Sequence, residues 1–208
     1  MFFMGALYLQ KVLGYDAFQT GLAFLPSTLV MGTLSLRYAE RLIMRFGARA
    51  TLLPGLALGV AGLILLTRAP VDGDYAEHVL PVMLLLGAGA GISFPALMTL
   101  SMSGATPADA GLASGLVNTT LQVGGALGLA VLATLSSTRT EDLRAAGDAI
   151  PAALNGGYHL AYLVGAGLIL AAFAVALLVL QPERRAGERT EAPEAAPHGR
   201  PEPAYEIC

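Results

Sequence analysis

Two amide side chains interrupt an otherwise apolar stretch and are the first residues whose types could do chemistry. Asn118 and Gln122 lie four residues apart, with Thr119 and Thr120 beside them, inside the uncharged run 110–138. This spacing places both amides on one face of a helix. Burying them in hydrocarbon without partners costs several kcal/mol. We therefore expect them either to hydrogen-bond to other helices or to face a water-filled cavity that accepts a ligand.

A second pair with the same spacing offers apolar contact instead. Phe94 and Met98 share a helix face in the uncharged run 79–108 and would adapt to ligands of varied shape. Pro95 removes a backbone hydrogen bond there, which predicts either a kink that serves packing or a flexible point beside a cavity. Phe94, Met98, Asn118 and Gln122 are thus our candidates for the wall of a small-molecule cavity.

Other kinds of chemistry have no residues to support them in the sequence. It contains no G-x-S-x-G or H-E-x-x-H motif, three scattered histidines and a single cysteine, Cys208. We therefore expect no enzyme, no metal site and no cofactor. No basic cluster is large enough to predict nucleic-acid binding. No acidic residue lies in the middle of an apolar run, so the chain offers no carboxylate proton carrier of the usual kind.

The elements that must position these residues are membrane-spanning helices. Of the 208 residues, 55% are hydrophobic and 13% charged, whereas a soluble domain carries about 25% charge. Five uncharged runs are long enough to cross a bilayer, which takes roughly 17–25 apolar residues. We predict an all-α membrane protein with spans at 19–37, 50–68, 79–101, 111–136 and 158–180, and loops at 38–49, 69–78, 102–110 and 137–157. Residues 1–10 read as the last turns of a truncated further helix.

The chain divides into two parts by composition. Residues 1–182 form the predicted transmembrane bundle, and residues 183–208 alternate proline with glutamate, arginine and alanine. The second part cannot bury enough apolar area to offset chain entropy, which predicts a disordered tail.

The placement of basic residues predicts the orientation. One side of the membrane would hold eight basic residues, and the other only four, among acidic ones. The excess places the 38–49 loop and the C-terminus in the cytoplasm. Eleven arginines against one lysine favour a bacterial genome, hence a multi-pass protein of the bacterial inner membrane. The eight residues are Arg37, Arg41, Arg45, Arg49, Arg184, Arg185, Arg189 and Arg200.

Glycine pairs at four-residue spacing mark expected helix contacts. Such a pair lies on one face and lets a neighbouring backbone approach closely. The pairs are Gly55 with Gly59, Gly87 with Gly91, and Gly124 with Gly128. We expect all three to pack against a neighbouring helix.

Three stretches resemble a known transporter family. AERLIMRFGARATLLPG (39–55) resembles the short cytoplasmic loop of major facilitator transporters. GLASGLVNTTLQVGGALGLAV (111–131) is similar to the penultimate helix of the 14-helix drug:proton antiporters, the EmrB/QacA-like branch, and LYLQKVLGYDAFQTGLAFLP (7–26) matches the entry into their C-terminal bundle. The resemblance covers about residues 1–180. It implies two six-helix bundles with a cavity between them, of which this chain would supply the C-terminal one.

The resemblance also directs attention to the cytoplasmic loops. Arginines spaced along 38–49 could reach neighbouring helix C-termini or acids and hold an inner gate shut, and Gly47 would permit the turn between two helices. Asp109 would cap the helix that begins near residue 111 or belong to the gate. The gate candidates are Glu40, Arg41, Arg45, Gly47, Arg49 and Asp109.

The leading functional hypothesis is part of a secondary transporter that exports amphipathic small molecules, with proton antiport as the implied coupling. Its partners would be the lipid bilayer, an N-terminal transporter half and a small-molecule substrate. The alternative is a non-transporting membrane fragment, or truncated gene product, that needs a partner bundle. The two hypotheses differ in whether a matching N-terminal half exists.

Overall fold

The computed structural model describes residues 2–68, 70 and 75–179, and every regular element among them is helical. Five helices are long and apolar enough to cross a membrane. A short helix, α1 (Phe2–Lys11), precedes them. The predicted all-α membrane fold is therefore confirmed. The five spans run Ala17–Phe46, Ala48–Leu66, Tyr75–Met102, Ala110–Ala145 and Ile150–Leu178.

The first span consists of three consecutive helical segments. Helix α2 (Ala17–Thr33) starts at Asp16, whose carboxylate accepts the backbone N–H of Gln19 at 2.7 Å in a capping box. It continues through a π-helical segment, η1 (Leu34–Ala39), into α3 (Glu40–Phe46). Most of the predicted 38–49 loop is thus helical, and that prediction was wrong. Charged residues end an apolar run, but they do not end a helix; glycine does.

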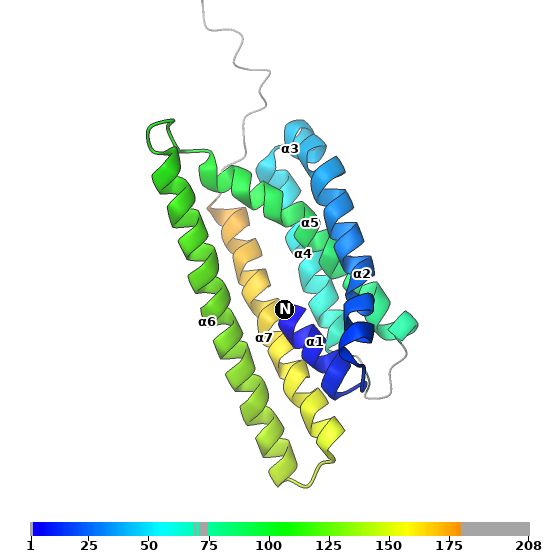
Figure 1. Ribbon diagram of the computed structural model, residues 1–208. Coiled ribbons are helices and arrows are strands. Elements are labelled where there is room, and N and C mark those ends of the chain that lie inside the picture. Colours follow the sequence, from blue (N-terminus) through cyan, green and yellow to red (C-terminus); the bar gives the residue numbers. More distant parts are fainter. Residues whose placement is uncertain (1, 69, 71–74, 180–208) are drawn as a thin grey trace, which may run out of the picture.

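Helix α5 packs tightly against its neighbours through glycines. Helix α4 (Ala48–Leu66) and α2 lie beside α5 (Leu80–Met102), which the π-helical segment η2 (Tyr75–Val79) precedes (Figure 1). A Cβ atom on Gly89 would lie 2.8 Å from the Gly55 carbonyl oxygen, and one on Gly87 would lie 2.5 Å from that of Ser27. A Cβ on Gly91 would meet Met31 in the same way. Two of the three predicted glycine pairs therefore do permit close approach.

Helices α6 (Ala110–Ala145) and α7 (Ile150–Leu178) form a long antiparallel hairpin at one side of the bundle (Figure 1). The 36 residues of α6 span about 54 Å, far more than the hydrocarbon core requires. Only a short turn at Gly147, with φ 97°, separates the two helices. The predicted loop 137–157 is therefore wrong as well. Gly157 makes the pairing possible, because a Cβ there would lie 2.5 Å from the Ser136 carbonyl oxygen.

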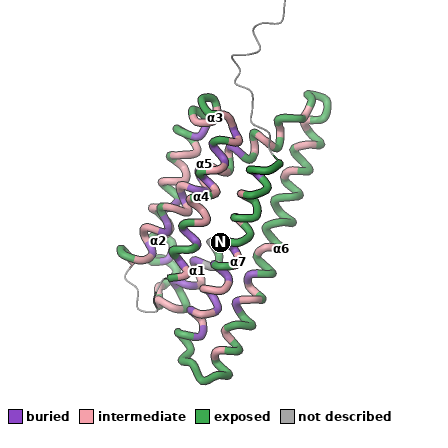
Figure 2. Tube along the Cα trace, turned by 180° about the vertical axis from the view of Figure 1, so that it is seen from behind, coloured by how far each residue is buried: buried purple, intermediate pink, exposed green. Residues whose placement is uncertain are grey.

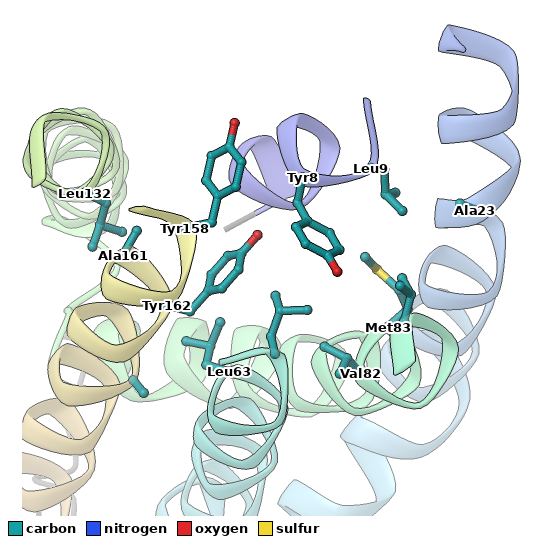
Figure 3. Close-up of a cluster of buried hydrophobic side chains, with 13 residues drawn as sticks. Tyr8, Leu9, Ala23, Leu63, Val82, Met83, Leu132, Tyr158, Ala161 and Tyr162 are labelled. Carbon is teal, nitrogen blue, oxygen red and sulfur yellow. The ribbon is translucent and has the colours of Figure 1, made fainter. Parts of the chain in front are cut away.

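The core lies where α1, α4, α5 and α7 meet. Figure 3 shows Tyr8, Tyr158 and Tyr162 close together among aliphatic side chains. The rings of Tyr8 and Tyr158 meet edge to face with centroids 6.4 Å apart. The Tyr8 hydroxyl donates to the Pro70 carbonyl at 3.0 Å. A short helix at the chain start is thus held in place by aromatic packing and by a hydrogen bond.

One helix takes little part in this core. Figure 2 shows α6 exposed along most of its length, in contrast to α4 and α5. Only Leu132 and Ser136 are buried on α6. The proposed tail, 183–208, lies outside the described residues.

Candidate functional site

The two amides project from the exposed helix α6. Asn118 and Gln122 are both exposed, and neither hydrogen-bonds to another described residue. Thr119 satisfies its hydroxyl within the helix by donating to the Gly115 carbonyl at 2.9 Å. The two amides therefore have no hydrogen-bond partner in the part of the chain that the structure describes, while the Thr119 hydroxyl has one.

The apolar pair lies on α5. Phe94 is 49% exposed and Met98 is half-buried. Pro95 lies within the helix, and Thr99 donates its hydroxyl to the Pro95 carbonyl at 2.9 Å. Ser93, one residue earlier, has a buried hydroxyl oxygen without a hydrogen-bond partner among the described residues. The hydrogen bonding of α5 is therefore irregular on both sides of Phe94, at Ser93 and at Pro95.

A cavity that the sequence did not indicate lies inside the helical bundle. Its volume is ≈190 Å³ and its walls come from α1, α2, α4, α5 and α7. None of the four candidate cavity residues lines it. The glycines of α4 and α5 were its only signal, because a missing side chain can leave space as well as allow contact. Its lining includes Gly5, Phe24, Gly59, Met83, Ser93 and Tyr162.

The third glycine pair, Gly124 and Gly128, lines a groove and does not contact a neighbouring helix. A Cβ on Gly124 or on Gly128 would meet nothing within 4 Å, so the expected packing there is wrong for this chain. Both glycines, with Gly125, face a groove of ≈330 Å³ between α4, α6 and α7. Leu56 and Ile169 line both this groove and the inner cavity, so the two spaces adjoin. Spacing alone marked a flat helix face but not whether a neighbour covers it.

The gate candidates gather at one end of the bundle. Gly47 forms the turn between α3 and α4 with φ 89°, as its residue type suggested. Arg49 follows it and donates from Nη2 to the carbonyl oxygen of Leu177, in the last turn of α7, at 2.7 Å. One of the predicted arginine contacts with a helix C-terminus is therefore present, and it ties α4 to α7.

The remaining gate candidates behave differently. The Arg45 guanidinium lies 5.3 Å from the centroid of the Phe46 ring. Glu40 and Arg41 are exposed. Asp109 occupies the N-cap position of α6, but its carboxylate accepts the Thr106 hydroxyl at 2.7 Å and does not bond to the helix. A side-chain cap at Asp109 is thus contradicted.

Comparison with known proteins identifies this arrangement. A family model described as Major Facilitator Superfamily matches residues 1–129. The chain is 37% identical over 193 residues to the "Cephamycin export protein CmcT" of Amycolatopsis lactamdurans, covering 93% of the chain and 37% of the relative. It is 34% identical over 203 residues to the "Puromycin resistance protein pur8" of Streptomyces alboniger, covering 95% of the chain and 40% of the relative.

The chain spans about two fifths of the length of these relatives. The family model covers well over half of the chain, and the five apolar helices agree with a membrane transporter fold. The chain therefore belongs to the Major Facilitator Superfamily.

Proposed function

We propose that this chain is the C-terminal half of an exporter of amphipathic small molecules in a bacterial inner membrane, coupled to proton antiport. The names of its relatives specify cephamycin export and puromycin resistance, and a further relative from Mycobacterium tuberculosis is a "Multidrug resistance protein Stp". The resemblance of 111–131 to the penultimate helix of 14-helix drug:proton antiporters supports the same assignment.

The observation that carries the proposal is the exposed amide face of α6. Asn118 and Gln122 stand 8 and 12 residues after the helix start at Ala110, which is about 12 and 18 Å along the axis. That depth falls inside a hydrocarbon core of about 30 Å. Lipid tails offer these amides no hydrogen bonds, so this face needs protein or water against it. An N-terminal half that encloses a cavity would supply both.

The apolar candidates complete the proposed cavity wall. Phe94 and Met98 lie on one face of α5, and Phe94 keeps half of its surface exposed. A ring and a thioether adapt to many apolar shapes. The two amides would add a few hydrogen bonds without selecting a charge. This combination fits a substrate class that is amphipathic and chemically varied.

The positions of the charged residues support the assignment of the proton carrier to the other half of the transporter. The acidic residues in or beside the described spans lie toward helix ends, at positions such as Asp16, Glu40, Glu77 and Glu141. Proton coupling usually relies on a carboxylate within the membrane. We therefore assign the proton carrier to the N-terminal half. The excess of arginine near α3 and in the tail supports a cytoplasmic C-terminus.

The arginines beside Gly47 are proposed as parts of an inner gate. Arg49 already ties the start of α4 to the end of α7. Arg41, Arg45, Glu40 and Asp109 lie at the same end and would meet charges of the opposite half in one state of the transport cycle. Rocking of two bundles would then break and form these contacts.

An efflux assay on the complete protein tests the cavity wall. Asn118→Ala and Phe94→Ala should lower export of several unrelated compounds by about tenfold, the effect of removing roughly 1.4 kcal/mol of binding. Matched controls are Thr138→Ala on the far part of α6 and Phe18→Ala on α2, both exposed. Unchanged export by both cavity variants would leave these residues as packing only.

The same assay distinguishes the half-transporter from the alternative. The 208-residue chain by itself should not export, because alternating access needs a second bundle around the site. Export by the chain alone would overturn the proposal. If the complete protein carries no export activity with any compound, the non-transporting alternative gains support.

A further inference from the structure

The first span extends well beyond what a bilayer core requires. Helical segments α2, η1 and α3 together cover the 30 residues Ala17–Phe46. A hydrocarbon core of about 30 Å takes about 20 helical residues, which from Ala17 end near Leu36. The last ten residues of the helix therefore lie at the level of the lipid headgroups, whichever leaflet they reach.

The exposed face of α2 has the composition of a surface that contacts lipid tails. Large apolar side chains follow one another along it at helical spacing, ending with Leu36, which is 86% exposed. The hydroxyl of the exposed Thr28 donates a hydrogen bond to the Phe24 carbonyl at 3.0 Å. This face thus lacks the unsatisfied mid-span amides of α6. The side chains are Phe18, Leu22, Leu25, Leu29 and Leu36.

Arginines continue from this apolar face into the headgroup level. Arg37, Arg41 and Arg45 recur every four residues and all three are exposed. They cover about 12 Å along the helix axis. Among the described residues none of them forms an ion pair. Met44 and Phe46, 72% and 58% exposed, lie beside them. We call Arg37, Arg41 and Arg45 the arginine stripe, and Glu40 is the one acidic residue between them.

The other charged end of the bundle differs. Near the turn between α6 and α7, Arg139 and Arg144 are accompanied by Glu141 and Asp142, so the four charges cancel. Arg49 is also distinct from the stripe, because its guanidinium is bound to the Leu177 carbonyl. Arg37, Arg41 and Arg45 therefore combine net positive charge, exposure and an adjoining apolar face.

We propose that Arg37, Arg41 and Arg45 bind the phosphate groups of anionic phospholipids whose acyl chains lie along the exposed face of α2. A guanidinium donates two parallel hydrogen bonds to phosphate oxygens, and it loses less hydration than an ammonium group. Arginines at successive heights can follow a headgroup as the helix tilts, while Met44 and Phe46 anchor the end of the helix in the interface. The lipid would thereby hold the η1–α3 segment at the membrane surface in the state of the transport cycle in which Arg41 and Arg45 are released from the proposed gate.

Lipid-dependent melting of the purified chain tests the proposal. Melting temperature is measured in detergent micelles at increasing fractions of phosphatidylglycerol or phosphatidylcholine. Half-maximal stabilisation should need at least about tenfold less phosphatidylglycerol, with the difference reduced by high salt. Arg41→Gln combined with Arg45→Gln should weaken the phosphatidylglycerol effect by about fivefold per arginine removed. Arg139→Gln combined with Arg144→Gln is the matched control and should leave it unchanged.

The outcomes separate the possible occupants of the stripe. Equal effects of the two lipids, or equal losses in the two double variants, would overturn the proposal. Stabilisation by inorganic phosphate alone would show a free-anion site instead of a lipid site. An unchanged phosphatidylglycerol response in the Arg41/Arg45 variant would also overturn the proposal. The arginines would then bind acidic groups of another protein segment instead of lipid. Arg37→Gln alone, which removes one charge from an exposed position, gives the same test if the double variant does not fold.

Discussion

At the residue scale, single glycines decide how closely the helices approach. Helix α5 presents Gly87 to Ser27 of α2 and Gly89 to Gly55 of α4. Both contacts bring backbone atoms to distances that any side chain would prevent. Gly124 on α6 has the same residue type in the same kind of apolar run, yet no atom lies within 4 Å of its Cβ position. Whether a glycine makes a close contact therefore depends on the position of the neighbouring helix and not on the glycine itself.

This contrast predicts opposite effects of the same substitution. Gly87→Ala should lower the stability of the chain by about 1–3 kcal/mol, because the new methyl group overpacks the α2–α5 contact. The gain in helix propensity, about 1 kcal/mol, offsets only part of that loss. Gly124→Ala gains the same propensity without a clash and should melt at or above the wild-type temperature. Thermal unfolding in detergent, followed by far-UV circular dichroism, measures both. A more stable Gly87→Ala variant would contradict the close contact.

At the element scale, the first two spans are joined by one residue. Helices α3 and α4 meet at Gly47, whose φ of 89° and ψ of 157° lie in a region that is essentially open to glycine alone. The turn orients Arg49 toward the end of α7, where it caps a helix that supplies no polar side chain of its own there. The backbone conformation of Gly47 thus determines where the Arg49 side chain lies.

Substitution of this turn should therefore act on the end of the bundle. Gly47→Ala should destabilise the chain by about 1–3 kcal/mol through backbone strain. It should also increase hydrogen exchange at the C-terminal amides of α7, since Arg49 would shift. Gly32→Ala is the matched control, because Gly32 lies within α2 with nothing within 4 Å of its Cβ position. Equal melting temperatures of the two variants would argue against strain at Gly47.

At the scale of the whole molecule, the bundle is asymmetric in what it exposes. Helices α4, α5 and α7 bury residues along their length, while α6 buries only two. The α3–α4 turn and the α5–α6 loop lie at one end, and the α6–α7 turn lies at the other (Figure 1). Residues at the two ends therefore face opposite sides of a membrane, and charge predicts which side is which.

Cysteine labelling checks this orientation. With Cys208 replaced by serine, Thr138→Cys on α6 should react with an impermeant maleimide in intact cells. Thr106→Cys, in the α5–α6 loop, should react only after permeabilisation, because the arginine excess predicts that this end lies in the cytoplasm. Labelling of both positions from the same face would contradict the topology, and exchanged reactivities would contradict the orientation alone.

The sequence by itself determined the membrane class, the five spans and the turn at Gly47. These depend on the length of apolar runs and on a residue type that tolerates a rare backbone conformation, both of which are local properties. It also pointed to Asn118, Gln122, Phe94 and Met98, since their types and spacing do not depend on neighbours.

Only the tertiary structure decided where the helices end and which faces meet. Residues 38–46 and 137–145 remain helical beyond the apolar runs, because charge ends a hydrophobic segment without breaking backbone hydrogen bonds. Arg49 finds a carbonyl of α7, while the arginines before it find no ionic partner among the described residues. The glycines of α5 are covered and those of α6 are not. Each outcome depends on how helices distant in sequence are rotated against one another, and four-residue spacing describes one helix only.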